Sequence, residues 1–437
     1  MKGAHTMRIA HFSDLHFGAK TLSEADRCFG AAIDRAIAAG AQAAVISGDA
    51  TDHALDLHAP AAARLAAQVR RLADGCPVLM LQGTYSHEPP GTLDVFRSIG
   101  GKHPIHVADS IQQVALTGRG GWVRSPSWQF ESLPADTVAL FSCLPTVNKA
   151  TVAAAVGAAQ AASAVGEHLG RLLAGFGPAN RLARSAGLPT IGVSHGTVFG
   201  SVSEHGVPMA GFDHEFTTGA LFAAETQAFM LGHIHRHQSW EQDSKAGRQL
   251  VAYAGSIGRF HYGEDGDKGF LLWEVDATRA SATLVPTPAR RTVDIVFEGR
   301  PDLSVLREAL AQQDVAGASV RADGSADPVS SGTLVFADGR TQPLTAQDLT
   351  VESLDYWTSP RSKAQYPQHW RITAPSVGLT LDVKSLLADQ ELNTARSTRV
   401  MYWEGAVSAT GQVHGTAVTG RGYVELTGYA ERFTQRL

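Results

Sequence analysis

The sequence predicts an α/β fold in which layered sheets form a sandwich flanked by helices, followed by a separate all-β domain. Strand-like apolar runs alternate with helical periodicity over the first 290 residues, which favours layered α/β architecture. From about residue 321 helical periodicity nearly vanishes, and short alternating segments are separated by Gly, Pro and Asp turns, as in a sandwich or barrel. A chain of 437 residues also exceeds what one compact core usually requires.

Each predicted element of the first part has its own signal. Short apolar runs predict strands, and apolar residues that recur every three to four positions predict helices. One helix begins at the capping residue Ser23, has Asp26 three positions on, and ends at Gly40. Strands are expected at 7–13, 41–47, 76–82, 136–142, 189–194, 226–231 and 249–254, and helices at 23–40, 54–74 and roughly 150–186.

A change of character near residue 290 sets the expected domain boundaries. Residues 292–313 contain one strand pattern and one helix pattern, and the segment "AGASVRADGSADPVSSG" that follows is rich in Gly, Ala and Ser. We expect three parts: an α/β domain over residues 1–288, a partial capping region or linker over 289–320, and an all-β domain over 321–437.

Composition narrows the class of protein. The net charge of −5 argues against broad nonspecific affinity for nucleic acid, although a local basic groove would not show in this total. Three widely spaced cysteines indicate reduced thiols and a cytoplasmic protein. The first residues lack the apolar region of a signal peptide, and no run of about 18 apolar residues occurs, so no membrane association is expected.

Five short motifs carry metal-binding residue types at the ends of predicted strands. They are "FSDLHFG", "ISGDATDH", "QGTYSHE", "VSHGT" and "LGHIHRH". They contribute Asp14 and His16, Asp49, Ser86 and His87, His195, and His233 and His235. One such motif alone is more often a polar strand end than a ligand. Five in order at strand ends of an α/β region predict one site.

The residue types predict a site for two divalent ions. Carboxylate, imidazole and neutral oxygen suit Mn²⁺, Fe or Zn²⁺, and Mn²⁺ fits the carboxylate share best. Asp49 can bridge two ions, with a metal-bridging hydroxide as the nucleophile on phosphorus. His87 is the candidate that stabilises the transition-state oxyanion or protonates the leaving oxygen, and Glu88 is the candidate that orients its ring.

The order of these motifs resembles that of the calcineurin-like metallophosphoesterases. The run "YAGSIGRFHYGEDGDKGFLLWEV" after the last histidines is similar to the SbcD branch, DNA repair exonucleases that work with an ATPase subunit. The resemblance covers about residues 7–300. It implies Mn²⁺-dependent hydrolysis of DNA, 3′–5′ exonucleolytic and endonucleolytic on single strands. It also implies a homodimer. The helices that dock on an SbcC-type ATPase are missing, so that partner is not expected.

The resemblance also implies a role for each site residue. Asp14, His16 and His235 would hold the first ion, Asp49 would bridge, and Ser86, His195 and His233 would hold the second ion. His87 matches the catalytic histidine. Asp52 and His53 lie where the branch places a residue near the substrate.

One position departs from the family pattern. Ser86 stands where the family has Asn, and Thr84 and Tyr85 separate it from Gly83. A serine hydroxyl is a shorter and weaker neutral donor than an amide carbonyl, so the second ion is expected to bind less tightly or to keep an extra water.

The C-terminal segment has a different resemblance. Residues 321–433 are similar to the last part of the AttH/CrtC lipocalin-like proteins, which implies a partial barrel with an exposed strand edge. The earlier half of that family is missing, so we transfer no activity.

Three functions remain open from the sequence. DNA hydrolysis is the leading hypothesis, with Arg119, Arg124 and the arginines at 171, 181 and 184 as candidate phosphate contacts. A phosphoesterase for nucleotides or other small phosphoesters is the second, because of the acidic net charge and the missing docking helices. A non-catalytic binding protein with a weakened metal site is the third.

Overall fold

The computed structural model comprises two compact units, and it describes most of the chain. The described residues are 6–56, 58–146, 158–206, 215–244, 247–261, 264, 266–296, 319–323, 331–335, 341–345, 348–393, 401–426 and 429. The first unit contains Met1–Val293, Val315–Ser319 and Leu437, and the second contains Asp294–Asp314 and Val320–Arg436. The predicted region 289–320 lies largely outside the described residues, so the three-part division stays a prediction.

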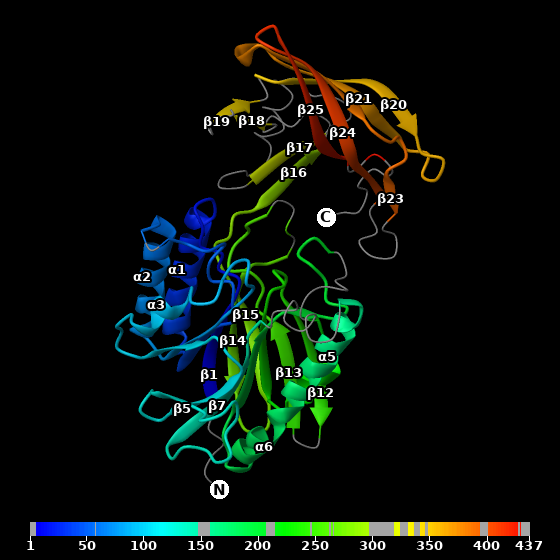
Figure 1. The fold of residues 1–437 in the computed structure, drawn as a ribbon. Coiled ribbons are helices and arrows are strands. Elements are labelled where there is room, and N and C mark those ends of the chain that lie inside the picture. The colour runs from blue at the N-terminus through cyan, green and yellow to red at the C-terminus, as the bar shows by residue number, and fades with distance from the viewer. Residues whose placement is uncertain are drawn as a thin grey trace. The chain divides into compact units, whose positions relative to one another are not determined.

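The first unit contains two large sheets (Figure 1). The first has the order β15 (Ala280–Pro286), β14 (Gly269–Val275), β1 (Met7–Phe12), β2 (Ala43–Ile46), β3 (Val78–Leu81), β4 (Ile105–Ala108). The second has the order β12 (Gln238–Ser244), β13 (Gly247–Tyr253), β11 (Ala228–Gly232), β8 (Thr190–His195), β7 (Thr137–Leu144), β5 (Gln112–Thr117), β6 (Trp122–Arg124). The described residues of this unit also contain a small pair of strands, β9 (Thr197–Val198) and β10 (Glu215–Phe216).

The two sheets pack face to face because alternate residues of their strands are apolar and buried. Ile9 of β1 and Ile191 of β8 belong to one buried cluster that draws on both sheets. Phe12 of β1 belongs to a second cluster, formed with the helices that cover the outer face. Successive side chains of a strand point to opposite faces, so a strand buried on both faces contributes to both clusters. The predicted class, layered α/β followed by a β part, is confirmed at this level.

Helices cover the outer faces of both sheets. On the first sheet lie α1 (Leu22–Ala38) and α2 (Pro60–Ala73), with α3 (Asp94–Arg97) next to β4. On the second sheet lie α5 (Ala158–Gly175), α6 (Gly177–Ser185) and α7 (Thr218–Phe222). Figure 1 shows the two groups on opposite sides of the sandwich. The first unit is thus a four-layer structure.

Two details of the helices differ from the predictions. The first helix begins at Leu22 with Thr21 as its N-cap, not at Ser23, and the Thr21 hydroxyl donates a hydrogen bond to the His16 carbonyl instead of capping the helix. The predicted helical stretch at 150–186 contains two helices, because Pro178 lies in the first turn of a new helix, where its missing N–H costs nothing. Residues 150–157 of that stretch lie outside the described residues.

In the residues that the structure describes, the second unit consists mainly of antiparallel strands. Its main sheet consists of β20 (Thr350–Thr358), β21 (Gln365–Ala374), β22 (Leu379–Ser385), β24 (Met401–Val413) and β23 (Glu391–Asn393), with β25 (Thr416–Leu426) paired to β24. The shorter elements are β16 (Thr292–Val296), β17 (Ser319–Asp323), β18 (Ser331–Val335), β19 (Thr341–Thr345) and the 3₁₀ turn η1 (Pro375–Val377). Trp370 and Trp403 are buried between the strands, whereas Tyr423 is exposed.

Two other predictions concern a helix within residues 292–313 and membrane-spanning segments. The helix predicted within 292–313 lies outside the described residues, and only its preceding strand, β16, is described. None of the described helices is both long enough and apolar enough to span a bilayer.

Candidate metal centre

The ends of five neighbouring strands deliver the candidate ligands to one edge of the sandwich. The strands β1, β2 and β3 run parallel in the first sheet, and β8 and β11 run parallel in the second. Side chains that follow parallel strands emerge at the same edge of a sheet. The residues placed in this way are Asp14 and His16 after β1, Asp49 after β2, Thr84 and His87 after β3, His195 at the end of β8, and His233 and His235 after β11.

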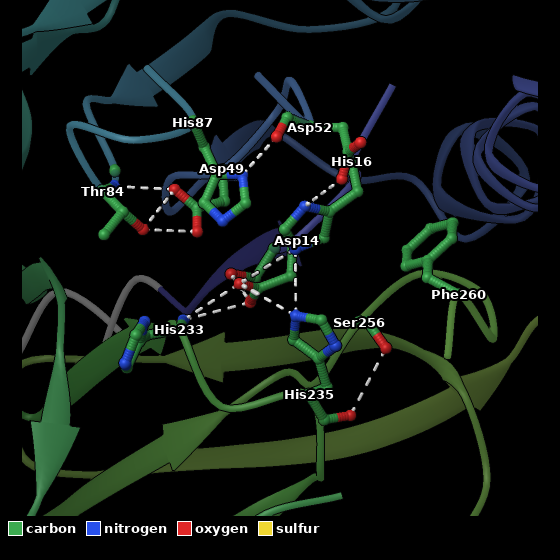
Figure 2. Close-up of polar contacts among 12 residues, drawn as sticks. Asp14, His16, Asp49, Asp52, Thr84, His87, His233, His235, Ser256 and Phe260 are labelled. Atoms are coloured by element: carbon green, nitrogen blue, oxygen red, sulfur yellow. Dashed lines mark hydrogen bonds and ion pairs between the residues drawn. The ribbon is translucent and has the colours of Figure 1, made fainter. Parts of the chain in front are cut away.

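The first donor set contains Asp14, His16 and His235, which are all buried. The Nε2 atoms of His16 and His235 lie 2.9 Å apart. Asp14 Oδ1 lies 4.0 Å from the first of these atoms and 3.9 Å from the second. Figure 2 shows the Asp14 carboxylate and the two rings converging on one point. One carboxylate and two imidazole nitrogens are thus positioned to bind a single cation.

The second donor set contains Asp49, His195 and His233. Asp49 Oδ2 lies 3.1 Å from His195 Nε2. The other ring nitrogen of His195, Nδ1, lies 2.8 Å from the Ser47 carbonyl. A carbonyl only accepts, so Nδ1 must donate, and Nε2 is the nitrogen turned toward Asp49. The second set therefore repeats the composition of the first.

The two sets are joined through the backbone. The His233 amide donates to both carboxylate oxygens of Asp14, at 3.2 and 3.1 Å. A residue of the second donor set thus orients the carboxylate of the first donor set. The His16 amide donates to the Asp49 carbonyl at 3.0 Å. Asp14, His16, Asp49 and His233 have positive φ angles of 50°, 46°, 51° and 104°. Such conformations are costly for residues other than glycine and gather at functional sites.

Two glycines permit this close approach. A Cβ atom at Gly232 would lie 2.3 Å from Ser13 Oγ and 2.7 Å from His195 Nδ1. A Cβ atom at Gly83 would lie 2.2 Å from Asp49 Oδ1. Both positions require a residue without a side chain, because real Cβ contacts are never so short.

The hydroxyl that lies beside Asp49 and His195 belongs to Thr84 and not to Ser86. Thr84 Oγ1 lies 2.9 and 2.6 Å from the two Asp49 oxygens and 3.3 Å from His195 Nε2. The Thr84 amide also donates to Asp49 Oδ1 at 2.7 Å. Ser86 is exposed and makes none of these contacts. The predicted ligand is therefore corrected: Thr84 directly follows Gly83, and the turn between Thr84 and His87 carries Ser86 away.

His87 lies at the border of the first set, as Figure 2 shows. Its ring packs edge-on against the His16 ring, with 4.9 Å between centroids. Its Nδ1 bonds to the Asp52 backbone carbonyl. The carbonyl can only accept, so Nδ1 carries the hydrogen and Nε2 is left as the ring atom for chemistry.

Glu88 is not the partner of the His87 ring, which corrects the role predicted for it. Its carboxylate is fully buried and accepts from the Ala50 and Gly83 amides, each at 2.6 Å. Consecutive residues of a helical turn point in different directions, so the side chain of Glu88 cannot follow that of His87. Glu88 instead ties the loop of Asp49 to the loop of Thr84. Burial, reinforced by the nearby Asp49 charge, raises the pKa of Glu88 to about 7.

The two residues predicted to contact substrate differ in placement. Asp52 Oδ1 lies 3.6 Å from His16 Nδ1, which supports a histidine of the first set. Contact with His16 lowers the pKa of Asp52 to about 2. His53 Nδ1 lies 3.4 Å from Asp52 Oδ2, and 55% of the His53 side chain is exposed. A role for either residue in substrate binding stays a prediction.

Burial and charge give the histidines of the second set opposite protonation. Burial alone would lower the pKa of His195, but the Asp49 carboxylate raises it to about 9. Burial, together with the charge of His195, lowers the pKa of His233 to about 4. The raised pKa of His195 therefore places a positive charge beside the buried Asp49 carboxylate when no metal is bound.

The donor sets fit divalent metal ions. Buried carboxylates and imidazoles that converge on a point are the ligands of Mn²⁺, Fe and Zn²⁺. The buried Nδ1 atoms of His16 and His235 have no hydrogen-bond partner among the described residues. A histidine that binds a metal through Nε2 usually donates its Nδ1 hydrogen to a carboxylate, and Asp52 Oδ1 lies 3.6 Å from His16 Nδ1. Asp14, His16 and His235 would hold one ion, and Asp49, Thr84, His195 and His233 the other.

Comparison with known proteins gives a family match for the C-terminal part. A family model described as AttH-like matches residues 312–429. The structure of an AttH protein from Nitrosomonas europaea is 35% identical over 22% of this chain and 29% of that chain, with a TM-score of 0.20. The chain thus spans less than a third of that protein. No curated protein sequence matches significantly.

Two further solved structures align with longer parts of the chain. A dimetal phosphatase from Danio rerio is 11% identical, covering 64% of this chain and 98% of that chain, with a TM-score of 0.38. A 5′-nucleotidase precursor from Thermus thermophilus is 18% identical, covering 70% of this chain and 58% of that chain, with a TM-score of 0.35.

Metal binding is expected to depend on pH through His195. The pKa of His195 is about 9 in the metal-free protein. A metal ion must therefore displace its proton. Metal affinity should rise by about tenfold per pH unit from about pH 7 and level off near pH 9. Isothermal titration with Mn²⁺ in buffers of different ionisation enthalpy measures the affinity and the protons released. Affinity that is constant over this range would contradict the assignment of His195.

Substitutions at Thr84 and Ser86 separate the two candidate ligands. Thr84→Val keeps the shape but removes the hydroxyl, and it should weaken binding of one ion by about tenfold or more. Thr84→Asn should keep or strengthen binding, because an amide oxygen replaces the hydroxyl. Ser86→Ala is the matched control and should leave both affinities unchanged. A loss in Ser86→Ala but not in Thr84→Val, measured by metal titration, would restore Ser86 as the ligand.

Proposed function

We propose that this chain is a phosphodiesterase that uses two divalent metal ions, with single-stranded DNA as its substrate and Mn²⁺ as the preferred ion. The observation that carries the proposal is the pairing of two sets of one carboxylate and two imidazoles at one edge of the sandwich. Two-metal sites of this kind serve in-line displacement at phosphorus.

The chemistry divides between the ions and the side chains around them. Two bound ions would activate water and neutralise the charge that develops on the phosphate. The Asp49 carboxylate contacts His195 of the second set, and the Asp49 carbonyl accepts from the His16 amide of the first set, which supports Asp49 as the bridging residue. His87 holds its hydrogen on Nδ1 through the Asp52 carbonyl. A protonated Nε2 can donate to the phosphate or to the leaving oxygen.

DNA as substrate is supported by the motifs rather than by surface charge. The order of the five motifs and the run after the last histidines are similar to the SbcD branch. The homodimer expected from that resemblance also stays a prediction.

A second candidate is a phosphoesterase for nucleotides or other small phosphoesters. The net charge is −5. Arg181 and Arg184 both pair with Glu225, and Arg124 donates to Ser110 Oγ, so these arginines are engaged within the protein. A long DNA strand gains affinity from free cationic side chains, whereas a small ester requires only contacts at the site.

Substrate assays with a ligand variant test the function. The metal-stripped protein is supplied with Mn²⁺ and assayed on single-stranded DNA, a chromogenic phosphodiester and a phosphomonoester. The wild type should degrade DNA and the diester. Asp49→Asn should lose nearly all activity, because a neutral side chain binds and bridges cations poorly. The matched control is Asp34→Asn, which alters an exposed carboxylate on α1 that pairs with Arg71 of α2.

Each outcome of this assay decides between the candidates. Activity on small esters alone would favour the second candidate. DNA degradation that survives in Asp49→Asn would exclude the metal mechanism. A wild type that binds fewer than two ions and hydrolyses none of the substrates would favour a binding protein.

His87 should be required for turnover but not for metal binding. His87→Ala removes the ring that faces the first set, and the rate should fall by about 10²–10⁴-fold, the usual contribution of a general acid. The number of bound Mn²⁺ ions, measured by elemental analysis, should remain two. His168→Ala, at an exposed position on α5, is the control. Loss of an ion in His87→Ala would make His87 a ligand instead.

A further inference from the structure

A buried ion pair lies directly behind His235. Glu264 and Lys268 face each other, with 2.5 Å between Glu264 Oε2 and Lys268 Nζ, and their side chains are 0% and 1% exposed. Both residues belong to the run "YAGSIGRFHYGEDGDKGF" that follows the ligand histidines. Neither residue belongs to the two donor sets described above.

Lys268 binds the backbone of the ligand segment. Its Nζ atom donates to the His235 carbonyl and to Ser256 Oγ, each at 2.9 Å. Figure 2 shows Ser256 next to the same carbonyl. With Glu264 as its third partner, the ammonium group uses all three of its donors. Lys268 thus fixes the main chain at His235.

Glu264 is oriented by the backbone as well as by Lys268. Its Oε1 atom accepts from the Phe260 amide at 2.9 Å and from the His261 amide at 2.6 Å. The same oxygen lies 3.9 Å from His235 Nδ1. That nitrogen is buried and has no hydrogen-bond partner among the described residues. A movement of about 1 Å would bring the pair into hydrogen-bond range.

The Glu264 carboxylate lies where a metal-binding histidine usually has its second partner. A histidine that binds a cation through Nε2 usually donates its Nδ1 hydrogen to a carboxylate or carbonyl, which fixes the tautomer and makes the ring a better ligand. The Nε2 atom of His235 faces His16 and Asp14. Its Nδ1 atom faces Glu264, and no other carboxylate of the described residues lies within ion-pair distance of this nitrogen.

We propose that Glu264, held in place by Lys268, is the positioning residue of His235 and sets the affinity of the first metal ion. This inference rests on the proposed two-metal function. The proposal gives a role to residues 256–268, which follow the candidate metal ligands in the sequence. This segment places the Glu264 carboxylate and its counter-ion Lys268 next to His235.

Two variants distinguish positioning from simple charge balance. Glu264→Gln keeps the shape but removes the charged acceptor. It also leaves Lys268 buried without its counter-ion, which alone could destabilise the fold. The double variant Glu264→Gln/Lys268→Met removes both charges and keeps the side-chain volumes close. The matched control is Glu225→Gln, which alters a carboxylate paired with arginines at the opposite end of β11.

The readouts are Mn²⁺ affinity by titration, the melting temperature of the metal-free protein, and kcat and KM for a chromogenic phosphodiester. Glu264→Gln should weaken one of two Mn²⁺ sites by about 10–100-fold. Saturating Mn²⁺ should restore most of kcat with KM unchanged. The double variant should regain the melting temperature of the wild type but keep the weakened site.

Three results would overturn the inference. The first is an unchanged Mn²⁺ affinity in Glu264→Gln, and the second is recovery of affinity together with stability in the double variant. The third is a third bound ion that Glu264→Gln removes, because Glu264, His235 and His261 would then form a metal site of their own. A wild type that binds no ions would instead refute the proposed function, so the two failures are distinguishable.

Discussion

The site depends on the burial of two like charges. Asp14 and Asp49 are almost fully buried on neighbouring strand ends. Removing a carboxylate from water costs several kcal/mol even after the protein relaxes. Histidines therefore surround both groups and hold the pKa of each below its usual range, although burial opposes this. The arrangement attracts cations: protons on histidine in the metal-free protein, and divalent ions when they are present.

The fold explains why this cost is tolerated. The sandwich core is formed by apolar side chains of both sheets, and none of the donor residues belongs to it. The loops that carry the ligands are short and cross-braced, because Glu88 ties two of them together and the His233 amide binds Asp14. Four residues of the donor sets have positive φ angles. Such costly backbone conformations persist only where many surrounding contacts hold the backbone in place.

The sequence allowed prediction of the layered architecture and of a group at one edge that contains Asp14, His16, Asp49 and the three later histidines. Apolar runs that alternate with helical patterns indicate layered sheets, and each of these residues follows or ends such a run. The sequence could not distinguish Thr84 from Ser86. Both are hydroxyl residues in one loop, and only the turn that bonds the His87 amide to the Thr84 carbonyl shows which one faces Asp49. The partner of the His87 ring was equally hidden, because it is a backbone carbonyl.

The contacts of His235 with Glu264 and Lys268 also depend on the burial of charged groups. A ligand histidine has two nitrogens, and the donor sets account for only one of them. Lys268 carries a positive charge in a buried place, where burial lowers its pKa and the Glu264 carboxylate opposes that shift. Such a buried pair is weak as a source of stability, since apolar residues of equal volume serve as well. Its position, with the carboxylate toward His235 Nδ1 and the ammonium on the His235 carbonyl, is therefore better explained by the requirements of the metal ligand than by those of the fold.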